Sequence, residues 1–136
     1  KTGALQLLYP DTLTEVQRKK DGVAMGGWCP MPPQFRLRNI WDLLLLNRGR
    51  TAENTLYRKA SWQLRLTGHS EAFPTQGKLP RKLAADAFVL NPGVAAALKS
   101  LNKPVLQETL GDWLDKKQIK GLLSRRDEMI RRFGPQ

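Results

Sequence analysis

The stretch FRLRNIWDLLLLNR, residues 35–48, contains four consecutive leucines, Leu43 to Leu46. Because successive residues of an α-helix are rotated by about 100°, four adjacent leucines reach every side of the helix. A helix that is apolar on all sides is normally buried. We therefore expect residues 35–48 to form a central helix of the core, and Gly49 is a favourable residue to end it.

The segment before this helix predicts one helix and one loop. Thr12-Leu13-Thr14-Glu15 has the spacing of a capping box, with Asp11 as an alternative cap. This predicts a helix over about 12–20 that ends at Asp21-Gly22. Residues 21–34 then contain three glycines and three prolines, which is typical of a loop.

The segment after the central helix allows two interpretations. Thr51 is a suitable cap for a helix that runs to about Leu66. One face of this helix is mostly apolar, and its opposite face consists of Thr55, Arg58, Trp62 and Arg65. The alternative is that Trp62–Leu66 forms a strand with alternating faces. We prefer the helix, because its periodicity extends over about four turns.

Further helices are predicted over residues 81–90, 92–101, 105–110 and 116–133. Asn91-Pro92 is an N-cap followed by proline in the first turn, and Asp115 caps the last helix. The last helix has an apolar stripe that comprises Ile119, Leu122, Leu123, Ile130 and Phe133.

These patterns predict a mostly α-helical fold. We expect a compact single domain over residues 1–136, with about five or six helices joined by Pro/Gly-rich loops. A minor β element near residues 4–9 or 62–66 is the alternative. The first residue is Lys1 rather than Met, which is compatible with a fragment of a longer protein.

The positive charge is concentrated in the middle of the chain. The net charge is +11, and residues 36–82 carry ten Lys/Arg against three Asp/Glu. Residues 1–35 carry four against three, and residues 83–136 carry nine against six. A basic, arginine-rich segment with interspersed aromatic residues favours binding of a polyanion through phosphate contacts and base stacking.

The predicted nucleic-acid-binding residues are the basic and aromatic residues of this segment. They are Arg36, Arg38, Arg48, Arg50, Arg58, Trp62, Arg65, Lys78, Arg81 and Lys82. In the predicted helix, Arg58 and Arg65 would hold two phosphates while Trp62 stacks on a base. The alternative is that Trp62 covers a neighbouring loop and the arginines are solvated.

Three further residues are candidate interface positions. Trp28 and Met31 lie in the Pro/Gly-rich loop, which is either a partner-binding surface or a cap on the core. Arg126 lies within the apolar stripe of the last helix, where we expect a snorkelling side chain or a salt bridge to Asp86 or Asp112. An interface or anion contact is the other interpretation. Arg125, Arg131 and Arg132 lie off the stripe and are expected to be solvated.

The sequence favours no catalytic or cofactor chemistry. Its one cysteine, Cys29, forbids an intrachain disulfide, and with the one histidine, His69, it is insufficient for a zinc site. No phosphate-binding glycine motif occurs, and no apolar run is long enough to span a bilayer. We therefore expect no cofactor, no metal, no transmembrane segment and no catalytic residues.

The predicted function is that of a non-enzymatic nucleic-acid-binding domain, with the choice between RNA and DNA open. The alternative is a protein-interaction or assembly domain whose basic face docks on an acidic protein partner or an anionic surface. The single cysteine is compatible with the cytoplasm or another reducing intracellular compartment.

Overall fold

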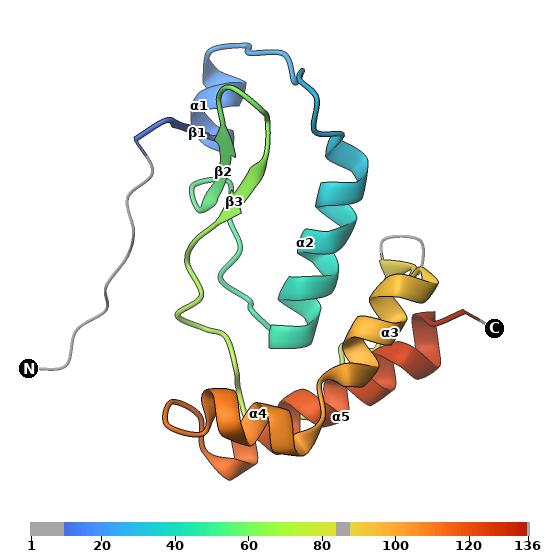
Figure 1. Cartoon of the computed structure of the whole chain (residues 1–136). Coiled ribbons are helices and arrows are strands. Elements are labelled where there is room, and N and C mark those ends of the chain that lie inside the picture. Colours follow the sequence, from blue (N-terminus) through green and yellow to red (C-terminus); the bar gives the residue numbers. More distant parts are fainter. Residues whose placement is uncertain (1–9, 84–87, 136) are drawn as a thin grey trace, which may run out of the picture. The chain divides into compact units, whose positions relative to one another are not determined.

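A computed structural model describes residues 10–83 and 88–135 (Figure 1). The chain divides into two compact units, which we describe separately. Unit 1 comprises Lys1–Gln34 and Thr51–Thr67, and unit 2 comprises Phe35–Arg50 and Gly68–Gln136. The expected mostly α-helical class with a minor β element is confirmed. The expectation of one domain over the whole chain remains a prediction.

From residue 10 on, unit 1 contains a small antiparallel sheet and a short helix. The elements are β1 (Thr12–Thr14), α1 (Glu15–Lys20), β2 (Thr55–Arg58) and β3 (Leu64–Leu66), and the sheet order is β1-β2-β3. Tyr57 in the central strand is paired with Leu13 on one side and with Leu64 on the other.

The helix predicted over 12–20 begins three residues later than expected. Thr14 is its cap: its hydroxyl accepts a hydrogen bond from the Gln17 amide at 3.1 Å, and the Gln17 side chain accepts from the Thr14 amide at 3.3 Å. The capping box is therefore Thr14 to Gln17. Residues 12–14 instead pair with β2, a partner more than 40 residues away that the local sequence does not reveal.

The helix predicted over 51–66 is wrong, because this segment forms the β2–β3 hairpin (Figure 1). Thr55 and Tyr57 are buried and Arg58 is exposed, which is the two-residue alternation of a strand. The chain reverses direction at Trp62, whose φ of 58° lies in the left-handed region and interrupts any helix. The alternative strand near 62–66 is thus the correct interpretation.

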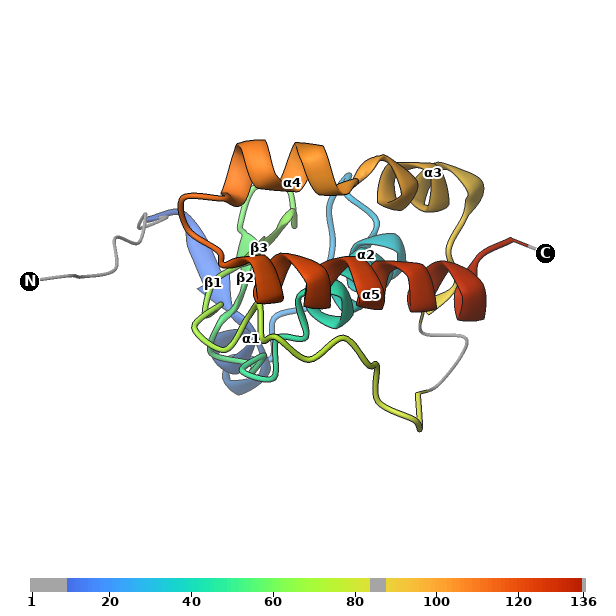
Figure 2. The same cartoon turned by 90° about the horizontal axis from the view of Figure 1, so that it is seen from below.

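The described residues of unit 2 form four helices. These are α2 (Met31–Leu45, of which residues from Phe35 on belong to the unit), α3 (Pro92–Ser100), α4 (Lys103–Leu110) and α5 (Lys116–Phe133). Figure 2 shows α3 and α4 lying side by side with α5. Asn91, Asn102 and Asp115 cap α3, α4 and α5 with their side-chain oxygens. The predictions for α3 and α5 are confirmed, whereas α4 begins at Lys103 rather than at residue 105, because Asn102 caps it.

Two other helix predictions differ from the structure. The central helix covers 31–45 and not 35–48, because Leu46 adopts a left-handed φ of 49°. The helix predicted over 81–90 is not found at 81–83 or 88–90, and residues 84–87 lie outside the described residues. The predicted β element near 4–9 also lies outside them.

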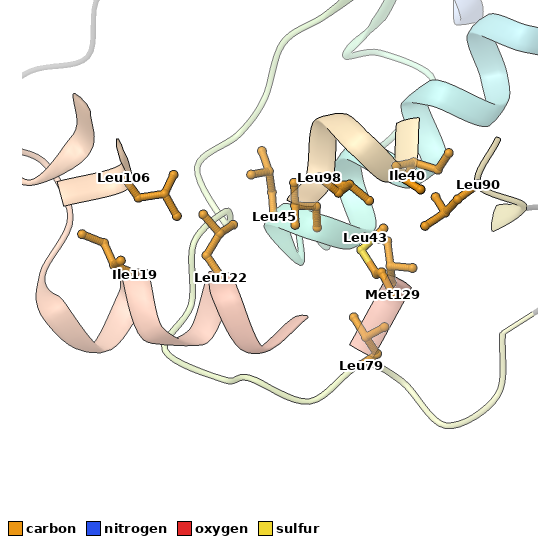
Figure 3. Packing of buried hydrophobic residues seen from close by; sticks show 12 residues of the cluster. Ile40, Leu43, Leu45, Leu79, Leu90, Leu98, Leu106, Ile119, Leu122 and Met129 are labelled. Atoms are coloured by element: carbon orange, nitrogen blue, oxygen red, sulfur yellow. The ribbon is translucent and has the colours of Figure 1, made fainter. Parts of the chain in front are cut away.

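The main hydrophobic core belongs to unit 2 and surrounds α2 (Figure 3). Leu43 to Leu46 are only 3–7% exposed, which confirms the central, buried position expected for the four leucines. Leu43 to Leu45 pack with Leu98 of α3, Leu106 of α4 and a row of side chains on α5, namely Ile119, Leu122 and Met129. Leu79 and Leu90, from the segment between α2 and α3, complete this cluster.

Candidate nucleic-acid interface

The predicted nucleic-acid-binding residues are distributed over both units. Unit 1 contains Arg58, Trp62 and Arg65, together with the interface candidates Trp28 and Met31. Unit 2 contains the remaining basic candidates, which are Arg36, Arg38, Arg48, Arg50, Lys78, Arg81, Lys82 and Arg126. The basic segment over residues 36–82 is therefore divided between the two units.

The helical face predicted for Arg58, Trp62 and Arg65 is not formed. Arg65 is paired with Leu56, so Arg58 and Arg65 lie on the same face of the sheet. Trp62 instead packs on Tyr57, whose side chain lies on the opposite face, with ring centroids 5.6 Å apart. It also covers Gly27, where a Cβ would lie 2.7 Å from the Trp62 ring. Trp62 thus has the packing role that was the alternative interpretation.

The loop before α2 leaves Trp28 in solvent. Trp28 is 77% exposed, and Met31 and Cys29 are half-buried. Gln34 fixes this loop to the hairpin: its amide nitrogen donates to the carbonyl oxygens of Cys29 at 3.4 Å and Trp62 at 3.2 Å. Its side-chain oxygen accepts from the Leu64 amide at 2.7 Å. Trp28 is therefore an exposed residue on an anchored loop of unit 1.

Arg50 is engaged in a structural ion pair at the end of α2. Its Nε and Nη2 atoms donate to the Asp42 carboxylate at 2.8 and 2.9 Å, and both side chains are only 13% exposed. His69 Nε2 lies 3.2 Å from Arg50 Nη2. Burial and the Arg50 charge lower the pKa of His69, and the Asp42 charge opposes this shift. The neutral ring fits its position beside a guanidinium.

Arg36 and Arg38 lie on α2, away from its C-terminal end. Arg36 is exposed, whereas Arg38 is half-buried, donates to Asn39 Oδ1 at 2.9 Å and lies 4.9 Å from the ring centroid of Phe35. Arg38 is therefore partly used within its own helix.

Three segments that carry basic residues come together where the segment after α2 runs beside the end of α5. Arg48 Nη2 donates to Gln76 Oε1 at 3.1 Å, and Gln76 Nε2 donates to the Lys78 carbonyl at 2.9 Å. Arg132 donates to the carbonyls of Pro80 at 3.1 Å and Arg81 at 3.4 Å. We call these basic residues the basic cluster and define it as Arg48, Lys78, Arg81, Lys82, Arg131 and Arg132.

The segment that carries the cluster is fixed to α5 by polar contacts and close packing. The Leu79 amide donates to Glu128 at 3.0 Å, and Gln118 donates to the Phe73 carbonyl at 3.0 Å. Gly121 allows the backbone of this segment to approach, since a Cβ there would lie 2.7 Å from the Thr75 oxygen. The cluster thus rests on a positioned backbone.

Arg125 provides the central anchor, and the expectation that it is solvated is wrong. Its side chain is 0% exposed, and Nε donates to the Leu44 carbonyl at 2.8 Å. Nη1 donates to the carbonyls of Pro74, at 3.1 Å, and Gln76. Burial lowers the pKa of Arg125, and Nη2 has no hydrogen-bond partner among residues 10–83 and 88–135. A sequence signal existed, because Arg125 lies three residues after Leu122 and four before Met129.

Arg126 makes contacts other than those predicted. Its guanidinium donates to the Leu101 carbonyl, just after α3, and to Asp127 Oδ1 at 2.8 Å. The expected bridge to Asp112 is not formed, and Asp86 lies outside the described residues. Arg126 therefore acts within unit 2, linking α5 to the end of α3.

A cavity of about 230 Å³ lies beside the cluster. Its lining includes Arg48 and Pro80, apolar side chains of Leu43, Leu46 and Phe88, and polar side chains of Asn39, Asp42 and Asn47. The Asn47 side chain is used within the fold: it donates hydrogen bonds to Asp42 and to the Gly68 carbonyl, and it accepts one from the Gly49 amide. The cavity thus combines an apolar wall with amide groups next to an exposed arginine.

Comparisons with protein families, curated proteins and solved structures find no match to this chain. Among the residues that the structure describes, no three His, Cys, Asp or Glu side chains are grouped so that they could hold a metal ion. Within the same residues, every helix is too short or too polar to span a lipid bilayer.

Proposed function

We propose that this chain is a non-enzymatic nucleic-acid-binding domain that contacts phosphates through the basic cluster of unit 2. The observation that supports it is the convergence of three segments, around residues 48, 78–82 and 131–132, by hydrogen bonds between them. Arg48, Lys78, Arg81, Lys82 and Arg131 are exposed. Basic side chains on a positioned backbone are suited to binding successive phosphates.

The charge balance of this region favours an anionic ligand. Unit 2 carries sixteen Lys/Arg and eight Asp/Glu. Within the described residues the carboxylate that pairs with the cluster is Glu128, which lies 3.4 Å from Arg132 and 3.9 Å from Arg131. Six cations accompanied by one carboxylate leave a strong local excess of positive charge, which raises the local concentration of a polyanion.

The adjacent cavity favours a strand with accessible bases. Phe88 and Pro80 supply an apolar wall, and Asn39 supplies an amide that can donate to and accept from a base edge. Bases are exposed in single strands and in loops, whereas a duplex keeps them stacked. We therefore propose single-stranded nucleic acid as the preferred ligand, with RNA and DNA to be distinguished by experiment.

The test is a set of fluorescence anisotropy titrations with labelled single-stranded RNA, single-stranded DNA and duplex DNA at several salt concentrations. The variant Arg48→Gln/Arg81→Gln should weaken binding about tenfold or more, because two charged phosphate contacts are lost. The slope of log K against log salt should fall by about 2. The control Lys99→Gln/Lys117→Gln removes the same charge from exposed positions outside the cluster.

Equal weakening in the control variant would show that binding depends only on net charge, and the proposal would then fail. The second candidate function is a protein-interaction domain, which the 77% exposure of Trp28 favours. In that case Trp28→Ala should abolish partner binding while nucleic-acid titrations show only weak, non-selective association.

A further inference from the structure

The groove between α4 and α5 has an unusual lining of three lysines. It has a volume of about 450 Å³ and is lined by Lys103, Gln107, Lys116, Ile119, Lys120 and Leu123. Its volume lies within the range of about 300–1,000 Å³ that is typical of small-molecule sites. The groove is separate from the basic cluster: Lys120 and Arg131 are eleven residues apart on α5, about 16 Å along the helix axis.

These lysines have no acidic partners in the part of the chain that the structure describes. Within the described residues, Lys103, Lys116 and Lys120 form no ion pair with a carboxylate, and no carboxylate lines the groove. Three ammonium groups around one groove, without a carboxylate in its lining, give the groove a positive potential. A positive potential favours an anionic ligand.

Two of these lysines lie at helix N-termini. Lys103 is the first residue of α4 and Lys116 is the first residue of α5, and neither helix has an acidic residue in its first turn. A cation at a helix N-terminus is unfavourable because the helix dipole is positive there. The Asp115 cap offsets this at α5, whereas the Asn102 cap of α4 is neutral. Lys103 is therefore not placed to stabilise its own helix electrostatically.

The remaining lining indicates what kind of anion fits. Ile119 is 3% exposed and, with Leu123, forms an apolar floor that suits a ring. The Gln107 amide can both donate and accept a hydrogen bond. Trp113, on the turn between α4 and α5 and three residues before Lys116, is 83% exposed and offers a stacking surface.

We propose that the α4–α5 groove binds a phosphorylated ligand of nucleotide size, with its phosphates on Lys103, Lys116 and Lys120 and its ring against Ile119 and Leu123. Lysine ammonium groups bind phosphate as point charges, without the fixed fork of arginine. The same chemistry is supplied by a free nucleotide or by one nucleotide of a strand. The proposal is independent of the function assigned to the basic cluster.

The test is isothermal titration calorimetry of the full chain with ATP, adenosine and inorganic tripolyphosphate. ATP should bind saturably and more tightly than either of the other two, because only ATP supplies both the ring and the charges. Lys116→Gln/Lys120→Gln should weaken ATP binding about tenfold or more, since two charge-assisted contacts are lost. Both positions are exposed, so these substitutions leave the core intact.

Lys117→Gln is the matched control, because it lies in the same helical turn and carries the same charge but does not line the groove. It should leave ATP binding almost unchanged, as should Arg48→Gln/Arg81→Gln. Competition of a short single-stranded oligonucleotide with ATP would identify the strand as a second source of the same ligand. Tripolyphosphate binding as tight as ATP, an equal loss in Lys117→Gln, or no saturable binding of ATP would each overturn the proposal.

Discussion

Replacing Arg125 with methionine should strongly destabilise unit 2. The guanidinium donates to the carbonyls of Leu44, Pro74 and Gln76, and the side chain is fully buried. Methionine fills a similar volume but donates no hydrogen bond, so the Leu44 carbonyl at the buried end of α2 loses its partner. Loss of a buried hydrogen bond to a charged group costs about 1.5–3 kcal/mol, and a buried carbonyl left unsatisfied costs about 1–3 kcal/mol.

The expected loss is smaller than the sum of three such bonds. Pro74 is half-buried and Gln76 is exposed, so water can replace the guanidinium at these two carbonyls. Removing a buried charge whose Nη2 has no partner among the described residues also recovers part of its desolvation cost. We therefore predict that Arg125→Met lowers the free energy of unfolding by about 3 kcal/mol, whereas Arg131→Met, at an exposed position, changes it by less than about 0.5 kcal/mol.

Urea unfolding followed by far-UV circular dichroism measures both variants. Arg125→Met should also weaken nucleic-acid binding under conditions in which the variant is still folded. The reason is that Arg125 holds the carbonyls of Pro74 and Gln76, and these belong to the segment that carries Lys78 and Arg81. A loss below about 1 kcal/mol, the size of an ordinary surface hydrogen bond, would refute the anchoring role derived for Arg125.

Two further predictions concern unit 1 and the packing of α5. Hydrogen bonds from Arg18, and from the buried hydroxyl of Tyr57 at 2.9 Å, lower the pKa of Glu15 from 4.5 to about 2, against the opposing effect of burial. Because the folded-state pKa is the lower one, this stabilisation is complete above pH 4.5 and is lost as the pH falls towards 2. Glu15→Gln should therefore unfold with a weaker pH dependence in that interval, and an unchanged pH profile in acid titrations of stability would contradict this. Gly121→Ala should destabilise by about 1–3 kcal/mol in thermal unfolding, since its Cβ would meet the Thr75 carbonyl at 2.7 Å, whereas Gly26→Ala, with no atom within 4 Å, should be nearly neutral.

Features that depend on local chemistry could be predicted from the sequence. Asn91 and Asp115 cap their helices as expected, because a cap needs only an oxygen and amides two or three residues away. The burial of Leu43 to Leu46 also follows from a local pattern. The β2–β3 hairpin could not be predicted in this way. The apolar residues of 51–66 match a helical period by coincidence, and β1, the strand that pairs with β2, is distant in the chain.

In the candidate site, too, local features could be predicted from the sequence and contacts between distant residues could not. The abundance of arginine is evident in the sequence, but the use of each arginine depends on distant partners. Arg50 is occupied by Asp42, while Arg132 joins the cluster through Pro80, 52 residues away. The sequence predicts a solvated Arg125 because this residue lies off the stripe of Ile119, Leu122, Leu123, Ile130 and Phe133, whereas the packing of α5 buries it. Tertiary contacts, rather than composition, decide which charges remain exposed.

The central claim is that nucleic acid contacts the basic cluster, and chemical-shift mapping tests it most directly. Amide spectra of the isotopically labelled chain would be recorded during titration with a short single-stranded RNA and, separately, with its DNA equivalent. We predict that the largest shifts gather at Arg48, at residues 76–82 and at Arg131 and Arg132. Shifts confined to the β2–β3 hairpin, or weak shifts spread evenly over all lysines and arginines, would contradict the account.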